Sequence, residues 1–280
     1  MSTTGTLFVI AVPLGNPRDI SARAIETLRM ADDVYSEDTR SAARLLREVG
    51  IERSSRSCFD GNEGQRAEEI AQALLGGRNV ALVSEAGTPA VSDPGFRVVR
   101  AAIAVGARVV PVPGASAPLC ALVASGLPTD RFFFAGFPPR KGGGRREFFQ
   151  MLSRIPATLI LFESPVRVAE TMADLAEVLG DRQACLAREI SKTHEEFVRG
   201  TLKELAGRYE DERPLGEITL VVAGVDPAAN VVDDEELGRR AQMMLNAGNS
   251  ARDVTRMLVE ETGLPRKRVY GVVLGVRGDG

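Results

Sequence analysis

Short apolar runs and amphipathic stretches alternate along the first part of the chain. The apolar runs with the length of buried strands are residues 7–12, 80–84 and 109–112. Apolar side chains within residues 67–74 recur at the i, i+3, i+4 and i+7 spacing of a helix, which Gly76 closes. Asp93 and Pro94 are typical of a helix start, so another helix is expected from there to Gly106. This alternation predicts a mainly parallel sheet with helices between its strands.

A second alternation of the same kind follows residues 126–131, where Gly and Pro interrupt the pattern. Its strand-like runs are residues 132–135, 158–162, 184–187 and 218–222, and its helical stretches are residues 166–179 and 202–209. We therefore expect two α/β domains with a boundary near residues 118–130. We place the first domain at residues 1–120 and the second at residues 121–225.

The sequence becomes polar and acidic after Gly224, and residues 225–236 are typical of a linker. The apolar and helical segments beyond it are residues 237–247, 251–261 and 269–273. The predicted fold class is therefore α/β, with two α/β domains and a small helical C-terminal appendage at residues 236–280.

Composition narrows the classes of function. No apolar run approaches the roughly 20 residues that cross a bilayer, and no export signal begins the chain, so we expect a cytoplasmic protein without membrane contact. The three cysteines have no zinc-ligand spacing, and the single histidine, His194, cannot build a multi-histidine site; we expect no metal. Because the net charge is −3, any RNA contact must use local basic patches.

Three loops follow the expected strands of the N-terminal domain, at residues 12–19, 84–95 and 112–117. The carboxyl ends of parallel strands are where such sheets bind ligands. Residues 84–95 are long for a connection between strand and helix, and their small side chains let the backbone approach a ligand closely. The G-x-G-x-x-G and G-x-x-x-x-G-K-[ST] fingerprints are missing, which disfavours ordinary dinucleotide and P-loop binding. The three loops together predict a ligand cleft, although each alone is compatible with a plain turn.

Specific motifs are spread over nearly the whole chain. They are Pro13-x-Gly15-Asn16-x-x-Asp19-Ile20, Glu37-Asp38-Thr39-Arg40, residues 84–95, Pro111-x-Pro113-Gly114, residues 125–132, Gly136-Phe137-x-Pro139, Glu163-Ser164-Pro165, Ala187-Arg188-Glu189 and Gly216-Glu217. On these motifs the chain resembles the tetrapyrrole (corrin/porphyrin) methylase superfamily and, within it, the ribosomal RNA small subunit methyltransferase I family. The resemblance implies an S-adenosylmethionine cofactor in a cleft between two α/β domains, and a homodimer. It also implies methyl transfer to the 2′-oxygen of a decoding-centre cytidine in the 16S rRNA of the small ribosomal subunit.

The resemblance further implies which positions hold the cofactor. These are Gly15, Ser84, Glu85, Ala86, Gly87, Thr88, Pro89, Ala90, Ser92, Ser116, Ala117, Gly216, Glu217 and Ile218. They lie on the three loops described above and on one further segment that begins at Gly216.

The chain departs from the family at two places that often carry histidine, residues 59–63 and Val166. We therefore expect that a carboxylate, or alignment of the reactants alone, replaces a histidine base; alignment can remove about 7–11 kcal/mol of barrier. The candidate bases, of which at most one serves, are Glu37, Asp38, Glu163 and Glu189. The alternative role for each is pairing with a nearby arginine, and His194 is expected to be a surface or structural residue.

Basic side chains gather in two segments that we expect to bind RNA phosphates. A predicted helix after Asp38 has apolar residues on one face and, on the other, Arg40, Arg44 and Arg47. Residues 138–154 contain three consecutive glycines, which predict a mobile loop, together with Arg140, Lys141, Arg145 and Arg146. The alternative for each segment is a solvated basic face.

Two other functions remain open at this point. A methyltransferase of the same fold can act on a tetrapyrrole or another small molecule, and a cofactor-binding regulator needs no catalysis. The basic segments and the motif at residues 125–131 favour RNA over the first alternative, whereas the cleft alone does not exclude the second.

Overall fold

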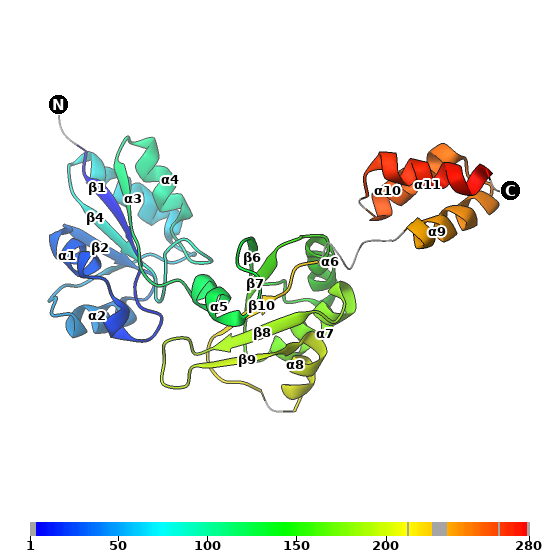
Figure 1. Ribbon diagram of the computed structural model, residues 1–280. Helices are drawn as coiled ribbons and strands as arrows, with labels where there is room; N and C mark the ends of the chain where they lie inside the picture. Colours follow the sequence, from blue (N-terminus) through cyan, green and yellow to red (C-terminus); the bar gives the residue numbers. More distant parts are fainter. Residues whose placement is uncertain (1–3, 212, 226–233, 263, 279–280) are drawn as a thin grey trace. The chain divides into compact units, whose positions relative to one another are not determined.

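The computed structural model describes residues 4–211, 213–225, 234–262 and 264–278. The chain forms two compact units. Unit 1 is Met1–Ser153 with Ala157–Ala223, and unit 2 is Arg154–Pro156 with Gly224–Gly280. Unit 1 contains two five-stranded sheets, and the described helices beyond them belong to unit 2 (Figure 1).

The first sheet of unit 1 is parallel throughout and has the strand order β3-β2-β4-β1-β5. Its strands are β1 (Thr6–Ile10), β2 (Asp33–Ser36), β3 (Arg56–Ser57), β4 (Val80–Val83) and β5 (Arg108–Val112). The connecting helices are η1 (Pro17–Asp19), α1 (Ala22–Met30), α2 (Thr39–Glu48), α3 (Glu63–Leu75) and α4 (Phe96–Ala104). Figure 1 shows α1 and α2 on one side of this sheet and α3 and α4 on the other.

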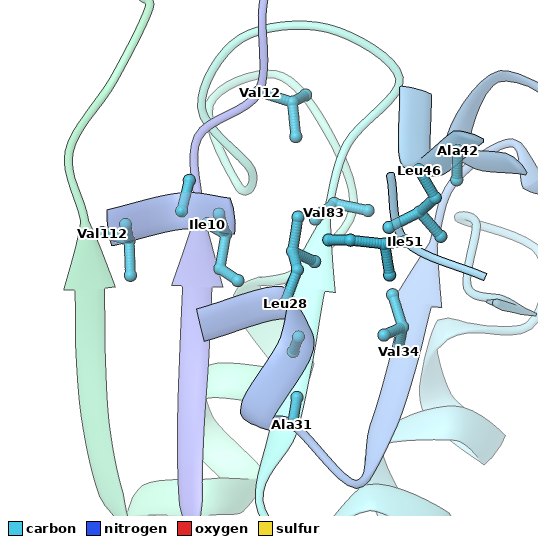
Figure 2. Packing of buried hydrophobic residues seen from close by; sticks show 12 residues of the cluster. Ile10, Val12, Leu28, Ala31, Val34, Ala42, Leu46, Ile51, Val83 and Val112 are labelled. Atoms are coloured by element: carbon cyan, nitrogen blue, oxygen red, sulfur yellow. The ribbon is translucent and has the colours of Figure 1, made fainter. Parts of the chain in front are cut away.

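Alternate strand residues supply the two hydrophobic cores of this three-layer arrangement. Ile10 and Val83 pack with Leu28 of α1 on one face, where Figure 2 shows these side chains converging. Leu7 and Leu82 pack on the opposite face with α3 and α4. Because both faces are covered, the inner strands are apolar runs, which explains why the sequence pattern revealed β1 and β4.

The second sheet is mixed and has the order β6-β7-β10-β8-β9. Its strands are β6 (Phe132–Gly136), β7 (Thr158–Glu163), β8 (Gln183–Arg188), β9 (Glu196–Thr201) and β10 (Ile218–Val222). Strand β6 is parallel to β7, whereas β10 is antiparallel to both β7 and β8, and β9 is antiparallel to β8. Its helices are α5 (Ala117–Ser125), α6 (Gly142–Leu152), α7 (Val168–Leu179) and α8 (Leu202–Arg208). Ala121 and Leu122 of α5 pack against Ile160 and Val221 of this sheet.

The structure confirms the α/β class and corrects three local predictions. Strands β2, β3 and β9 were not predicted, because they are short or lie at sheet edges and carry polar residues. Helix α4 begins at Phe96 after Gly95, so Asp93 does not cap it. The expected mobile loop at residues 138–154 is wrong, since Gly142–Leu152 form α6. The division at residue 120 stays a prediction.

Unit 2 contains three described helices, α9 (Asp234–Asn246), α10 (Ala251–Thr262) and α11 (Arg266–Gly278). They enclose a small core that includes Leu237, Val254, Leu258, Val269 and Val273. These helices confirm the expected helical C-terminal segments, while residues 226–233 of the expected linker lie outside the described residues. None of the described helices is long and apolar enough to span a membrane.

Candidate functional site

A cavity of about 390 Å³ lies within unit 1. Its wall includes residues of the loops that follow strands of the first sheet, such as Leu14 after β1, Glu37 after β2 and Ser116 after β5. The second sheet contributes the end of β7, including Glu163, and the start of β10, including Ile218. The predicted cleft at the carboxyl ends of the first sheet is therefore present, and its volume lies in the range of small-molecule sites, roughly 300–1,000 Å³.

The cavity brings together many, but not all, of the positions expected to hold the cofactor. Those in the wall are Glu85, Ala86, Gly87, Thr88, Ser116, Ala117, Gly216, Glu217 and Ile218. Those outside it are Gly15, Ser84, Pro89, Ala90 and Ser92. Ala90 and Ser92 have φ angles of 66° and 62°, so these positions shape the turn of the loop.

Hydrogen bonds fix the loop that follows β4. Gly87 N donates to Val12 O at 3.0 Å, and Val12 N donates to Gly87 O at 2.8 Å, which ties the loop to the end of β1. Thr88 Oγ1 donates to Ala115 O at 3.0 Å and connects it to the loop after β5. Gly87 has φ = 75°, and a Cβ there would lie 3.1 Å from Leu14 Cδ2, so glycine is needed at this point of the wall.

Three carboxylates line the cavity without a hydrogen-bonded lysine or arginine among the residues that the structure describes: Glu37, Glu85 and Asp93. No lysine or arginine belongs to the wall among the described residues. Burial raises the pKa of Glu37 above its ordinary value. Burial, and next the negative charge of Glu37, raise the pKa of Asp93 to about 7. The cavity is therefore suited to a positively charged ligand and contains a carboxyl group that titrates near neutral pH.

The four carboxylates proposed as bases have different surroundings. Asp38 accepts hydrogen bonds from Arg40 N and Ser41 N and caps α2. Glu163 is buried; its oxygens accept from Arg167, Ser164 N and Thr171. Glu163 thus has the arginine partner that the sequence left open as its alternative role, whereas Asp38 caps a helix instead of pairing with an arginine side chain.

Glu189 also has a cationic partner, since Lys192 Nζ lies 2.9 Å from its Oε1. Burial opposes ionisation of Glu189, but the hydrogen bond and charge of Lys192 outweigh it and hold the pKa of Glu189 below its usual value. Among the four candidates, Glu37 is thus the one that lines the cavity without a basic partner in the described part of the chain.

Asp93 is a titratable residue of the cavity wall that sequence reasoning missed. Because Asp93 precedes Pro94, the sequence indicated a helix cap. Asp93 was therefore not considered a ligand-binding residue, although it lies in the long loop at residues 84–95. Asp93 could have been proposed because it lies in a loop that was expected to bind a ligand. The burial that raises its pKa depends on packing and cannot be predicted from the sequence.

The two basic segments, helix α2 and residues 138–154, differ in the exposure of their arginine side chains. In α2, Ala42 and Leu46 are buried, while Arg40, Arg44 and Arg47 are exposed, which confirms the predicted faces of this helix.

The expectation that Arg145 binds RNA is wrong, because its side chain is buried, whereas the same expectation for Arg146, which is 52% exposed, stays a prediction. The Arg145 side chain is 1% exposed and its Nη2 lies 2.5 Å from Asp174 Oδ2, and Arg146 Nε lies 3.1 Å from Asp174 Oδ1. Arg145 shares the inner face of α6 with Phe149 and Leu152, because helical spacing aligns these positions. Arg140 and Lys141 remain exposed.

The described residues contain no group of three or more side chains that could hold a metal ion. His194 is exposed in the connection between β8 and β9.

Known proteins are similar to this chain in sequence and in fold. The sequence model described as Tetrapyrrole (Corrin/Porphyrin) Methylases matches residues 6–206. A ribosomal RNA small subunit methyltransferase I from Micromonospora olivasterospora is 46% identical over 269 residues, covering 95% of this chain and 86% of the relative. The protein of the same name from Synechocystis sp. is 40% identical over 278 residues, covering 99% of this chain and 100% of the relative.

Solved structures share the fold. The methyltransferase CobJ superposes with a TM-score of 0.60 at 19% identity, covering 79% of this chain and 95% of that one. Uroporphyrin-III-C-methyltransferase from Thermus thermophilus gives a TM-score of 0.57 at 21% identity, covering 78% and 94%. The matched residues and the identities to the relatives lead to one assignment: the chain belongs to the tetrapyrrole (corrin/porphyrin) methylase family and, within it, to the ribosomal RNA small subunit methyltransferase I family.

Proposed function

We propose that this chain is an S-adenosylmethionine-dependent methyltransferase that modifies the 2′-oxygen of a decoding-centre cytidine in 16S rRNA. The observation that carries the proposal is the acidic cavity of about 390 Å³ in a member of a methylase family. The relatives named ribosomal RNA small subunit methyltransferase I, which match nearly the whole chain, support small-subunit rRNA as the substrate. That substrate also supports action in the cytoplasm.

The size of the cavity, its small wall residues and its charge support the proposal that it holds the cofactor. Its small wall residues Ala86, Gly87 and Ala117 leave room for a flat adenine and a ribose, and Gly87 cannot carry a side chain without crowding Leu14. Glu37, Glu85 and Asp93 provide negative charge without a hydrogen-bonded lysine or arginine. S-adenosylmethionine carries a positively charged sulfonium and ammonium, so these carboxylates favour its binding.

When bound, S-adenosylmethionine supplies a methyl group attached to a positively charged sulfur. The enzyme's own task is to hold the ribose hydroxyl in line with that group and to accept its proton. Asp93 is suited to accept the proton, since its pKa of about 7 lets it be ionised and still a useful base at neutral pH. The Asp93 carboxylate would hold the proton that the hydroxyl loses, while the cofactor, when bound, would give up its methyl group by cleavage of the carbon–sulfur bond and leave as a neutral thioether. Glu37 keeps Asp93 a stronger base through its negative charge.

The exposed arginines of α2 support an RNA substrate. Arg40, Arg44 and Arg47 project from a helix whose N-terminal cap, Asp38, directly follows Glu37 of the cavity wall. Phosphate contacts orient RNA without reading its sequence. Arg140 and Lys141 are a second exposed basic pair for which we propose the same role.

The homodimer is also a proposal, supported by the outer face of α5. One side of this helix packs on the second sheet, yet its remaining residues are apolar as well. Leu119 is 47% exposed and Val123 is 74% exposed in the single chain. An apolar face of this kind favours coverage by a second copy.

The test is transfer of labelled methyl from S-adenosylmethionine to three acceptors: small ribosomal subunits, protein-free 16S rRNA and a precorrin. We expect label in the RNA of at least one of the first two acceptors and none in the precorrin. Label in the precorrin alone would assign the chain to small-molecule methylation, and no transfer to any acceptor would favour a regulator without catalysis.

A further inference from the structure

A second cavity, of about 340 Å³, lies beside the cofactor cavity. Its wall is formed by the loop after β1, including Pro13 and Pro17, and by the side of α2 that carries Arg44 and Glu48. Leu14 and Glu85 belong to the walls of both cavities, so the two spaces are direct neighbours.

We infer that this second cavity is the pocket for the target nucleotide, and that it selects cytosine. The inference rests on the proposed function, which requires a nucleotide whose 2′-oxygen reaches the cofactor cavity. Sequence-specific proteins recognise RNA mainly through unstacked bases, and a base that leaves the stack needs a shaped pocket. A volume of about 340 Å³ lies within the range of ligand pockets, about 300–1,000 Å³.

The charges of the pocket match a cytidine nucleotide. Arg44 is exposed at its rim and forms no ion pair or side-chain hydrogen bond with any described residue, so its guanidinium is free for a phosphate. Glu48, one turn further along α2, and Glu85 place carboxylate oxygens in the same wall. Carboxylates accept a hydrogen bond from the exocyclic amine of cytosine, whereas uracil presents an oxygen at that position.

The remaining wall provides apolar surface for a base. Pro13, Pro17 and Leu45 line the pocket, and the aliphatic stem of Lys192 packs directly on Gly15 and holds the loop after β1 in place. Lys192 is itself fixed by Glu189 at 2.9 Å and Glu217 at 3.3 Å. Because Leu14 and Glu85 border both cavities, a nucleotide in the second cavity has its ribose next to the first, whose wall also contains Glu37 and Asp93.

The experiment uses the full chain and two substrates, small ribosomal subunits whose 16S rRNA carries either cytidine or uridine at the target position. The variants are Glu48→Ala and Arg44→Gln, and the matched controls are Glu52→Ala and Arg108→Gln, which are exposed and lie outside both cavities. The readouts are kcat/KM for each subunit, KM for RNA, and the Kd for cofactor by calorimetry.

We expect the wild type to prefer cytidine at least about tenfold, since one base contact gives discrimination of this order. Glu48→Ala should bring this ratio down severalfold, and Arg44→Gln should raise KM for both subunits, while the controls and all cofactor Kd values stay within about twofold. An unchanged ratio in Glu48→Ala, or an unchanged KM in Arg44→Gln, overturns the inference and leaves the proposed function standing. If the wild type methylates neither subunit, the proposed function fails and the inference fails with it.

Discussion

Glu37 and Asp93 share a cavity wall that contains no lysine or arginine among its described residues. Their mutual repulsion and their burial make ionised Asp93 costly in the folded protein, because its pKa is raised to about 7. Such a cost without a compensating ion pair is typical of functional sites, where a group is tuned for its task rather than for stability.

The first prediction concerns Asp93→Asn, which should be more stable than the wild type yet far less active. In the folded protein the pKa of Asp93 is raised to about 7, so folding disfavours its ionised form. Below the pKa of the unfolded state Asp93 is protonated in both states and folding has no such cost. The wild type then loses stability as pH rises through about 7. The Tm advantage of Asp93→Asn should therefore be absent near pH 4 and reach its full value above pH 7. Each kcal/mol corresponds to about 2–4 °C.

The activity readout completes this test. Turnover of Asp93→Asn should drop about 10²-fold or more with cofactor binding preserved, whereas His194→Ala should retain most activity. Glu37→Gln should move the pH midpoint of the stability difference to lower pH, since it removes a negative charge near Asp93. A variant Asp93→Asn with normal turnover, or an inactive His194→Ala that still binds cofactor and RNA, would refute this assignment of the base.

The second prediction concerns Gly87→Leu, which should abolish cofactor binding in calorimetry. The side chain would enter the cavity wall beside Leu14, and φ = 75° adds strain of roughly 1–2 kcal/mol. Gly50→Leu is the matched control, because Gly50 has φ = 70° but open space around its Cβ position. Both variants carry the same backbone strain, so a loss of cofactor binding in Gly87→Leu alone reports on the cavity wall. Unchanged cofactor affinity in Gly87→Leu would exclude the loop after β4 from the cofactor site.

Sequence reasoning at single positions succeeded where the local pattern decides the environment. The loop that contains Glu85 and Gly87 was identified from its length and small residues, and both residues line the cavity. It failed for Arg145, whose positive charge indicates solvent exposure or phosphate binding. The burial of Arg145 depends on Asp174, 29 positions further along the chain, and no local pattern reports such a contact.

At the scale of elements, α6 and α7 are joined by this buried ion pair. Arg145 Nε donates to Asp174 Oδ2 at 2.7 Å, and the same guanidinium reaches Glu170 at 2.6 Å. Removing one partner of a buried pair leaves the other charge without compensation, which is why such changes are costly even where the intact pair adds little stability.

The third prediction follows from this pair. Arg145→Met should lower the free energy of unfolding by about 3 kcal/mol, because buried Asp174 loses its main partner. Urea unfolding measures the change, with exposed Arg140→Met as the control that should stay within about 0.5 kcal/mol. If Arg145→Met is as stable as the control and instead weakens RNA binding, our correction of its role is wrong.

Some elements that the sequence revealed are buried on both faces, such as β4 and β10, whose residues are all buried. The edge strands β5 and β6 were revealed by their apolar composition alone. Strand β9 was missed because it pairs only with β8 at the sheet edge and alternates polar with apolar residues. The antiparallel placement of β10 between β7 and β8 was likewise invisible, since strand order is decided by contacts far apart in sequence.

At the scale of the whole molecule, every described residue that lines the cavity of about 390 Å³ belongs to unit 1. The fourth prediction is that residues 1–223 alone bind S-adenosylmethionine with a Kd within about threefold of the full chain. Calorimetry of the truncated protein measures this, with circular dichroism as the control for folding. A folded truncation that has lost cofactor binding would show that unit 2 is needed for the site.

The measurement that tests the account most directly is nucleoside analysis by mass spectrometry of 16S rRNA after incubation of small ribosomal subunits with the protein and labelled S-adenosylmethionine. The account predicts a single new labelled product, 2′-O-methylcytidine from the decoding centre, formed by the wild type and reduced about 10²-fold or more in Asp93→Asn. Label on a base, or on a ribose outside the decoding centre, would contradict it.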